Sequence, residues 1–227
     1  MVEGDLDAGL VAQMMEIARD PSLRAAVYDR IGEYFHQCRN RLNSLKLSLY
    51  LVKRQADGEL SDAWSCLDRH YGELEQKVDT VQRLCRPMTL SRVRIGLELL
   101  IDDRRSAWTE VWTARHGTLR FVGPPGPVVA RLDVDRLGHA LDAFVAWRAE
   151  QGGEALDVTL RWWSESGDVR LSWEESPGAA DPDPAEDSRW SLPWLIRVIA
   201  EHGGETEVRD GEGWRLALRW PASPPAC

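Results

Sequence analysis

Seven apolar side chains between residues 31 and 52 recur at alternating steps of four and three residues. They are Ile31, Phe35, Cys38, Leu42, Leu45, Leu49 and Val52. This is the a/d spacing of a helix that packs along a shared seam with other helices, so the stretch predicts a long amphipathic helix. Because Asp20 can cap a helix and Pro21 favours its first position, we expect the helix to run from Pro21 to about Gln55.

A second predicted helix follows the turn at Ala56-Asp57-Gly58 and ends before Pro87. Its apolar stripe comprises Leu60, Ala63, Leu67, Leu74, Val78, Val81 and Cys85. Two such antiparallel helices form a hairpin whose stripes one chain alone cannot cover. The pattern therefore predicts a homodimer in which two hairpins pair as a four-helix bundle. His70 falls on the seam of the second helix, so we expect it in the core or between helices.

A polar cluster lies one residue past a seam position of the first helix. His36 occupies that place, and Arg39 and Asn40 follow three and four residues later on the same helical face. A neutral imidazole nitrogen can attack phosphorus, and the alternative is a surface histidine without a chemical role. Asn40 is either a residue that orients water or phosphoryl oxygens, or a solvated side chain. Arg39 could pair with phosphoryl oxygens or with a carboxylate of the second helix.

The rest of the chain alternates short strands with helices, which predicts an α+β class. We expect helices over residues 5–19, 90–114, 135–151 and 191–204, and strands at 118–122 and 128–134. Two antiparallel hairpins are expected as well, ALDVTLRWW with DVRLSWE and ETEVRD with GWRLALRWP. Residues 176–189 are rich in Pro, Ala and Asp and predict a mobile loop.

Composition excludes several classes of partner. The formal net charge is −9 and the isoelectric point is near 5.1, so the chain lacks the basic footprint that nucleic acid or an anionic membrane requires. No apolar run approaches the roughly 18 residues of a transmembrane helix, and the first ten residues are acidic, so we expect a cytoplasmic protein. Four cysteines, Cys38, Cys66, Cys85 and Cys227, form no C-x-x-C pair, which predicts reduced thiols and neither a disulfide nor a metal site.

Three segments, in order and spacing, resemble sequence boxes of two-component sensor histidine kinases. His36-Gln37-Cys38-Arg39-Asn40-Arg41-Leu42 is similar to the H-box, commonly H-E-x-R-N-P-L. Residues 132–141, LDVDRLGHAL, resemble the lead into the asparagine-bearing helix, and residues 191–204 resemble the last glycine box with its helix. The resemblance covers residues from about 25 to 221. It implies a dimerisation hairpin followed by an α/β sandwich of the ATP-binding (Bergerat) type.

The segments depart from the family at the positions that bind the nucleotide. The asparagine that holds Mg²⁺ corresponds to Trp147 and the asparagine before it to Ala143. Indole offers no oxygen to a hard cation. The D-x-G-x-G adenine site is similar to residues 174–178, so its aspartate corresponds to Glu174 and of its glycines only Gly178 is kept.

The last glycine box and the H-box depart from the family as well. Arg189 and Ser191 stand where the box has glycines, and their side chains would obstruct the close approach of a phosphate. Gln37 replaces the acidic residue that serves as base in autophosphorylation, and an amide can hydrogen-bond the imidazole but not accept its proton. The resemblance therefore implies a degenerate domain without a cofactor, and a phosphoacceptor His36 flanked by Gln37, Arg39 and Asn40.

Tryptophan is abundant, with eleven residues in the chain, most of them beyond residue 140. Trp147, Trp173, Trp190 and Trp194 lie close to the altered boxes. They either fill the former nucleotide pocket or thicken an ordinary core, and the sequence leaves both possibilities open.

These features together predict a histidine phosphotransferase that passes a phosphoryl group between receiver-domain aspartates through His36. The receiver domains of response regulators would be the partners and would supply Mg²⁺. We do not expect ATP-dependent autokinase activity. A divergent active histidine kinase and a non-catalytic dimeric scaffold for a response regulator are the alternatives. The expected organisation is an N-terminal helix (1–21), the hairpin (22–88), a degenerate ATP-binding-like domain (89–221) and a tail (222–227).

Overall fold

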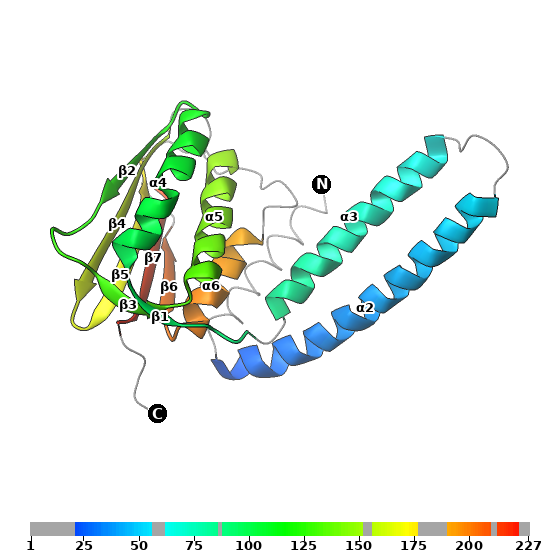
Figure 1. Ribbon diagram of the computed structural model, residues 1–227, viewed down its shortest axis with the longest axis horizontal. Helices are drawn as coiled ribbons and strands as arrows, with labels where there is room; N and C mark the ends of the chain where they lie inside the picture. Colours follow the sequence, from blue (N-terminus) through cyan, green and yellow to red (C-terminus); the bar gives the residue numbers. More distant parts are fainter. Residues whose placement is uncertain are drawn as a thin grey trace. The chain divides into compact units, whose positions relative to one another are not determined.

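The computed structural model describes residues 21–55, 62–85, 88–151, 156–176, 190–209 and 213–222. They fall into two compact units, a helical unit within Ser22–Pro87 and an α+β unit that includes the chain from Met88 onward (Figure 1). The predicted helix at 5–19, most of the loop at 176–189 and most of the tail lie outside the described residues. None of the described helices is both long enough and apolar enough to span a bilayer.

The first unit is a hairpin of two long helices, α2 (Pro21–Gln55) and α3 (Asp62–Cys85). Its core consists of a few side chains from the two facing stripes. They are Leu42, Tyr71 and Val78, with Phe35, Cys38 and Leu49 packed around them. The Tyr71 hydroxyl donates to the Leu42 carbonyl at 2.9 Å, which ties the helices together, and burial raises the pKa of Tyr71.

His70 does not lie in the core of the hairpin, one of the two places predicted for it. Its side chain is 61% exposed, and its Nδ1 lies 3.2 Å from a carboxylate oxygen of Glu73. The buried position belongs to Tyr71, which completes the four-three spacing between Leu67 and Leu74. Because a helix turns about 100° per residue, a phase error of one residue is enough to move a side chain out of the core.

The second unit contains two sheets. β1 (Val93–Gly96) and β3 (Val129–Leu132) form a small antiparallel pair. The larger sheet has the order β2-β4-β5-β7-β6. Its strands are β2 (Thr118–Val122), β4 (Asp157–Glu165), β5 (Asp168–Glu175), β6 (Glu205–Arg209) and β7 (Arg215–Pro221). β2 runs parallel to β4 and the other neighbours are antiparallel, so the sheet is mixed.

Three helices cover one face of the larger sheet, α4 (Leu97–Thr113), α5 (Val134–Gln151) and α6 (Ser191–Glu201) (Figure 1). The strands alternate between buried and exposed residues, as a sheet covered on one face requires. In β7, for example, Leu216, Leu218 and Trp220 are buried while the residues between them are exposed. The core of the unit therefore lies between this face and the three helices.

Most predicted elements are present, with one clear correction. The strand at 118–122, the helix at 135–151, the helix after residue 190 and both hairpins are confirmed. The first hairpin turns at Ser166 and Gly167, whose φ values of 55° and 84° suit a two-residue turn of type I′. The helix expected from residue 90 is wrong at its start, because residues 93–96 pair with β3 and α4 begins only at Leu97.

Candidate functional site

His36 lies on the outer face of α2, away from the hairpin core. A second stripe with four-three spacing runs along this face, and its positions follow those of the seam by one or two residues. It comprises His36, Asn40, Asn43, Leu47, Tyr50 and Arg54, all of them exposed. Residues at this spacing share one face of a helix. The imidazole is therefore open to another molecule, beside two amides and, further along α2, two exposed apolar side chains.

The other predicted residues of the histidine site separate into two groups. Gln37 and Asn40 are exposed, and the Asn40 backbone carbonyl accepts a hydrogen bond from the Ser44 hydroxyl at 3.1 Å. Arg39 instead points toward α3, where its Nη2 donates to Asp79 Oδ2 at 3.2 Å. Of the two alternatives for Arg39, the structure contains the ion pair with the second helix.

One flank of the hairpin core is charged. Lys46 Nζ donates to Glu75 Oε2 at 2.8 Å and lies 5.4 Å from the centre of the Tyr71 ring. The hydrogen bond to Glu75 raises the pKa of Lys46. Lys46 is seven residues from Arg39, so both ion pairs lie on the same flank of the seam. On this flank the two ion pairs connect α2 to α3.

The opposite flank is apolar and uncovered. Leu45 and Val52 of α2 and Leu67 and Leu74 of α3 are between 43% and 53% exposed. In each helix the two leucine or valine positions are seven residues apart and therefore form one stripe. Four large apolar side chains on one flank of a two-helix hairpin are typical of a surface that packs against another protein.

In the second unit, a buried ion pair joins α5 to β5. Arg148 donates to Glu175 through Nε at 2.8 Å and through Nη2 at 2.5 Å. The two side chains are 4% and 0% exposed. Trp173 Nε1 adds a third hydrogen bond to Glu175, at 2.7 Å from Oε1. The carboxylate is thus fully engaged by groups of its own chain.

Aromatic rings enclose the guanidinium of Arg148. Its Cζ lies 4.4 Å from the centre of the Trp214 ring and 5.1 Å from that of Trp147. Phe144 completes the cluster, with its ring centre 5.9 Å from Trp214 and 5.1 Å from Trp173. We call these residues the Arg148 cluster: Phe144, Trp147, Arg148, Trp173, Glu175 and Trp214. Stacked guanidinium and indole groups attract one another and exclude water from this part of the interior.

The predicted nucleotide-binding positions are distributed around this cluster. Trp147 is a member of it, and Ala143 lies one turn earlier on α5, half-buried. Ser191 is the first residue of α6 and is also half-buried. Gly178 and Arg189 lie outside the described residues.

Glu174 and Glu175 project to opposite faces of β5. Glu174 is paired with Thr159 and Arg215 in the sheet register, and it alternates with the buried row that ends at Glu175. The carboxylate that faces the helices is therefore Glu175 rather than Glu174. The buried row Val169, Leu171, Trp173 and Glu175 is the signal in the sequence that could have identified it. No comparable pattern in the sequence marks Arg148 or Trp214.

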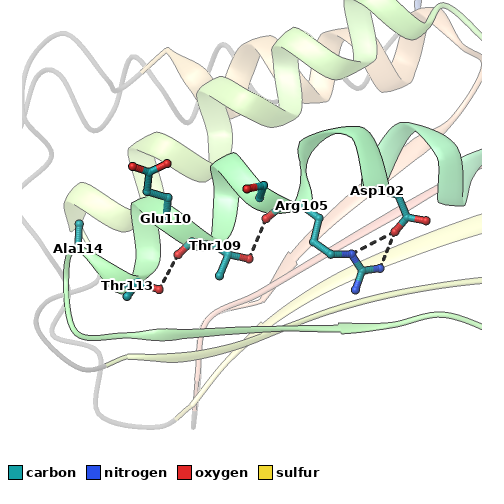
Figure 2. A pocket seen from close by; sticks show the side chains of 7 residues that line it. Asp102, Arg105, Thr109, Glu110, Thr113 and Ala114 are labelled. Atoms are coloured by element: carbon teal, nitrogen blue, oxygen red, sulfur yellow. Dashed lines mark hydrogen bonds and ion pairs between the residues drawn. The ribbon is translucent and has the colours of Figure 1, made fainter.

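A shallow depression runs along the outer surface of α4 (Figure 2). It is lined by Asp102, Arg105, Ser106, Thr109, Glu110, Thr113 and Ala114. The threonine hydroxyls donate to carbonyls one turn earlier in the same helix, and Arg105 pairs with Asp102 at 2.7 Å. The lining residues named here belong to α4 or, in the case of Ala114, cap its end, so nothing converges on a ligand, and we assign the depression no role.

Metal ligands do not gather in the part of the chain that the structure describes. No group of three or more His, Cys, Asp or Glu side chains is close enough there to hold a metal ion. Trp147 stands where a metal-binding asparagine would be expected from the sequence resemblance, and it contributes an indole to the Arg148 cluster. The Trp147 indole therefore offers Mg²⁺ no oxygen ligand at this position of α5.

Known proteins were compared with this chain in sequence and in fold. Neither a protein-family model nor a curated protein sequence matches the chain. Solved histidine kinases match its fold. The nucleotide-free catalytic domain of histidine kinase ThkA superposes with a TM-score of 0.51 at 17% identity, covering 60% of this chain and 98% of that domain. A histidine kinase from Burkholderia phymatum STM815 gives a TM-score of 0.51 at 19% identity, with 98% and 99% coverage.

A third structure includes a partner. Histidine kinase ThkA in complex with response regulator protein TrrA gives a TM-score of 0.56 at 16% identity, covering 91% of this chain and 64% of the kinase. At these identities the likeness establishes the fold. The α+β unit thus has the fold of a histidine kinase ATP-binding domain, as the sequence resemblance implied.

Proposed function

We propose that this protein is a homodimeric, cytoplasmic histidine phosphotransferase of two-component signalling. A receiver-domain aspartyl phosphate would give its phosphoryl group to His36, and His36 would pass it to the aspartate of another receiver. The observation that carries the proposal is the Arg148 cluster. A fold of the histidine kinase type here fills its helix-sheet interior with its own ion pair and indoles.

The acidic group of the cluster is already engaged. The carboxylate of Glu175 accepts hydrogen bonds from Arg148 and Trp173, so it is not available to an adenine amino group. Removing a buried charge from its partner costs about 3–5 kcal/mol, which an incoming ligand would have to compensate. No step of the proposed reaction therefore passes through ATP.

The transfer itself needs little from this chain. The unprotonated ring nitrogen of His36 attacks phosphorus and forms an N–P bond, and the P–O bond to the donor aspartate breaks. The electron pair of that bond leaves with the carboxylate, while the second ring nitrogen keeps its proton. Attack by an aspartate of the next receiver reverses these events. Aspartyl phosphate is already activated, so positioning and charge compensation suffice.

The exposed stripe of α2 is suited to this positioning. Gln37 can hydrogen-bond the imidazole, and Asn40 lies one turn from His36 on the same face. Leu47 and Tyr50, 61% and 60% exposed, extend the stripe and offer apolar contacts to a receiver that covers His36. The receiver would bring its own Mg²⁺ and acidic residues. The complex of ThkA with TrrA supports a response regulator as the class of partner.

A second copy of the chain is the proposed occupant of the uncovered flank. Leu45, Val52, Leu67 and Leu74 lie on the side of the hairpin that the ion pairs leave open. Pairing this flank with its copy about a two-fold axis gives a four-helix bundle and keeps the His36 stripe outside. Two transfer sites per dimer result.

Phosphotransfer measured with the native chain and with His36→Ala tests the proposal. Phosphorylated receiver domains should label the native chain with an acid-labile phosphate, and His36→Ala should take no label while it keeps its dimeric state. Calorimetry with Mg-ATP tests the kinase alternative, which a dissociation constant near or below ~0.1 mM would restore. If no cognate receiver labels the native chain, the scaffold alternative replaces the relay.

A further inference from the structure

The first residues of the α+β unit are held at a small buried hub. The backbone N–H of Ser91 donates to Asp133 Oδ2 at 2.7 Å. Arg92 follows, and its Nη2 donates to the backbone carbonyl of Glu201 at 2.6 Å. Asp133 precedes α5 and Glu201 ends α6. The chain that arrives from the hairpin is therefore fastened to two helix ends at once.

Asp133 uses all of its polar groups in this hub. It is 5% exposed. Its Oδ1 accepts the Arg136 N–H at 2.9 Å, as a residue that caps the N-terminus of α5, and its carbonyl accepts the Leu137 N–H at 3.0 Å. Its own N–H donates to His202 Nε2 at 2.9 Å. The position of the Asp133 backbone, and hence of the carboxylate that holds Ser91, depends on that imidazole.

The contacts of His202 fix its protonation state. The side chain is 4% exposed, and Nδ1 lies 2.7 Å from the Val198 carbonyl, which can only accept a hydrogen bond. Nδ1 therefore carries the proton, and Nε2, which faces the N–H of Asp133, carries none. Burial lowers the pKa of His202 and the nearby Arg92 lowers it too, whereas the Val198 hydrogen bond, Asp133 and Glu201 act in the opposite direction. The arrangement suits the neutral imidazole alone.

We propose that Asp133 and His202 form a proton-sensitive clasp that fixes the start of the α+β unit. A proton on Nε2 would set two donors against each other, so the Asp133 backbone has to withdraw and its carboxylate releases Ser91. The charged groups that face His202 are Arg92, Asp133 and Glu201, and the arginine favours the closed, uncharged state. Opening the clasp frees the segment that connects this unit to the hairpin. This device does not depend on the proposed phosphotransfer.

Hydrogen exchange followed by mass spectrometry tests the clasp in the full-length native chain. The readout is the peptide that spans Met88 to Ile95, at about pH 7.5 and about pH 5.0, with rates corrected for the intrinsic effect of pH. We expect protection of this peptide to fall roughly tenfold or more at the lower pH. A peptide from β5 reports on the core of the same unit and should keep its protection.

Two substitutions of His202 make the test specific. His202→Gln can keep an acceptor near the position of Nε2 but does not titrate, so we expect protection that no longer changes with pH. His202→Asn can reach only the position of Nδ1, so we expect the Met88 to Ile95 peptide to lose protection already at neutral pH. Equal protection of the native chain at both pH values, or an equal loss in His202→Gln, would overturn the clasp. So would full protection in His202→Asn.

Discussion

Arg39 reaches across the hairpin to Asp79, with 3.2 Å between Nη2 and Oδ2 and about a third of each side chain exposed. The guanidinium therefore lies on the charged flank between the helices, not on the stripe that carries His36. Arg39 is part of the H-box resemblance, but its contact with α3 indicates that it sets the packing of the hairpin.

Arg39→Gln and Asp79→Asn should consequently behave alike. Each removes one side of a partly exposed ion pair, and we expect each to lower the free energy of unfolding by about 1 kcal/mol or less. Both variants should take label from a phosphorylated receiver at nearly the native rate. A loss of labelling in Arg39→Gln alone would assign the guanidinium to the transfer step instead.

The two faces of α2 can be separated by a pair of substitutions two residues apart. Leu45→Asp places a charge on the uncovered flank, and in a buried interface this costs several kcal/mol, so we expect a monomer by light scattering at micromolar concentration. Leu47→Asp changes the His36 stripe and should leave the dimer intact while it weakens transfer from the receiver. If Leu45→Asp stays dimeric, the flank is not the dimer interface.

Arg148→Ala should destabilise the α+β unit by about 3–5 kcal/mol, because it leaves the carboxylate of Glu175 buried without its cation. Denaturant unfolding followed by tryptophan fluorescence measures the change. Arg209→Ala is the matched control, since its pair with Glu207 is more than half exposed and should contribute less than about 1 kcal/mol. If Arg148→Ala does not fold, the double variant Arg148→Met/Glu175→Leu should fold, because it leaves no unpaired charge in the interior. If the double variant does not fold either, the unpaired carboxylate is not the cause.

Gly204→Ala tests the close packing after α6. A Cβ at this position would meet the Arg219 carbonyl oxygen and would lie 2.8 Å from the Cβ of Trp220, in both cases against atoms that cannot rotate away. We expect a loss of about 1–3 kcal/mol or more in the free energy of unfolding. Gly126→Ala, where a Cβ would meet nothing within 4 Å, should change it by less than about 1 kcal/mol.

The stability of the α+β unit should also depend on pH through His202. Its pKa in the folded state lies below the ordinary value of 6.5 that it has when unfolded, so the unfolded chain binds more protons in this range. The contribution of His202 to the free energy of unfolding should therefore be complete above about pH 6.5. It should fall as the pH decreases below that value and level off below the pKa of the folded state. The carboxylates titrate in both variants. Subtracting the free energy of unfolding of His202→Gln from that of the native chain at each pH therefore leaves the contribution of His202 alone.

Local patterns in the sequence were sufficient for much of the fold. The four-three seam located α2, and the alternation in residues 157–175 located the hairpin of β4 and β5, because both periods follow directly from backbone geometry. The position of His36 on an exposed face also followed from the seam. These features depend on residues that are close together in the chain, so they can be predicted from a single sequence.

Long-range partners could not be read in the same way. Val93 to Gly96 form a strand only because β3, more than thirty residues later, pairs with them. Arg148 and Glu175 are 27 residues apart, and nothing in the spacing of either residue predicts that they meet. The alternation of β5 marks Glu175 as the buried carboxylate, whereas the sequence resemblance had indicated Glu174. Of the tryptophans near the altered boxes, Trp147 packs in the Arg148 cluster, and Trp173 contacts both the cluster and the core.

The Arg148 cluster also bears on how the protein responds to the metabolic state of the cell. A domain that binds a nucleotide gains RT ln(1 + [L]/Kd) in stability, so its folded population follows the supply of that nucleotide. Here the ion pair and the indoles pack between α5 and the sheet, and they are part of the chain itself. Under the proposed function, the folded fraction of the protein therefore does not depend on the ATP level of the cell.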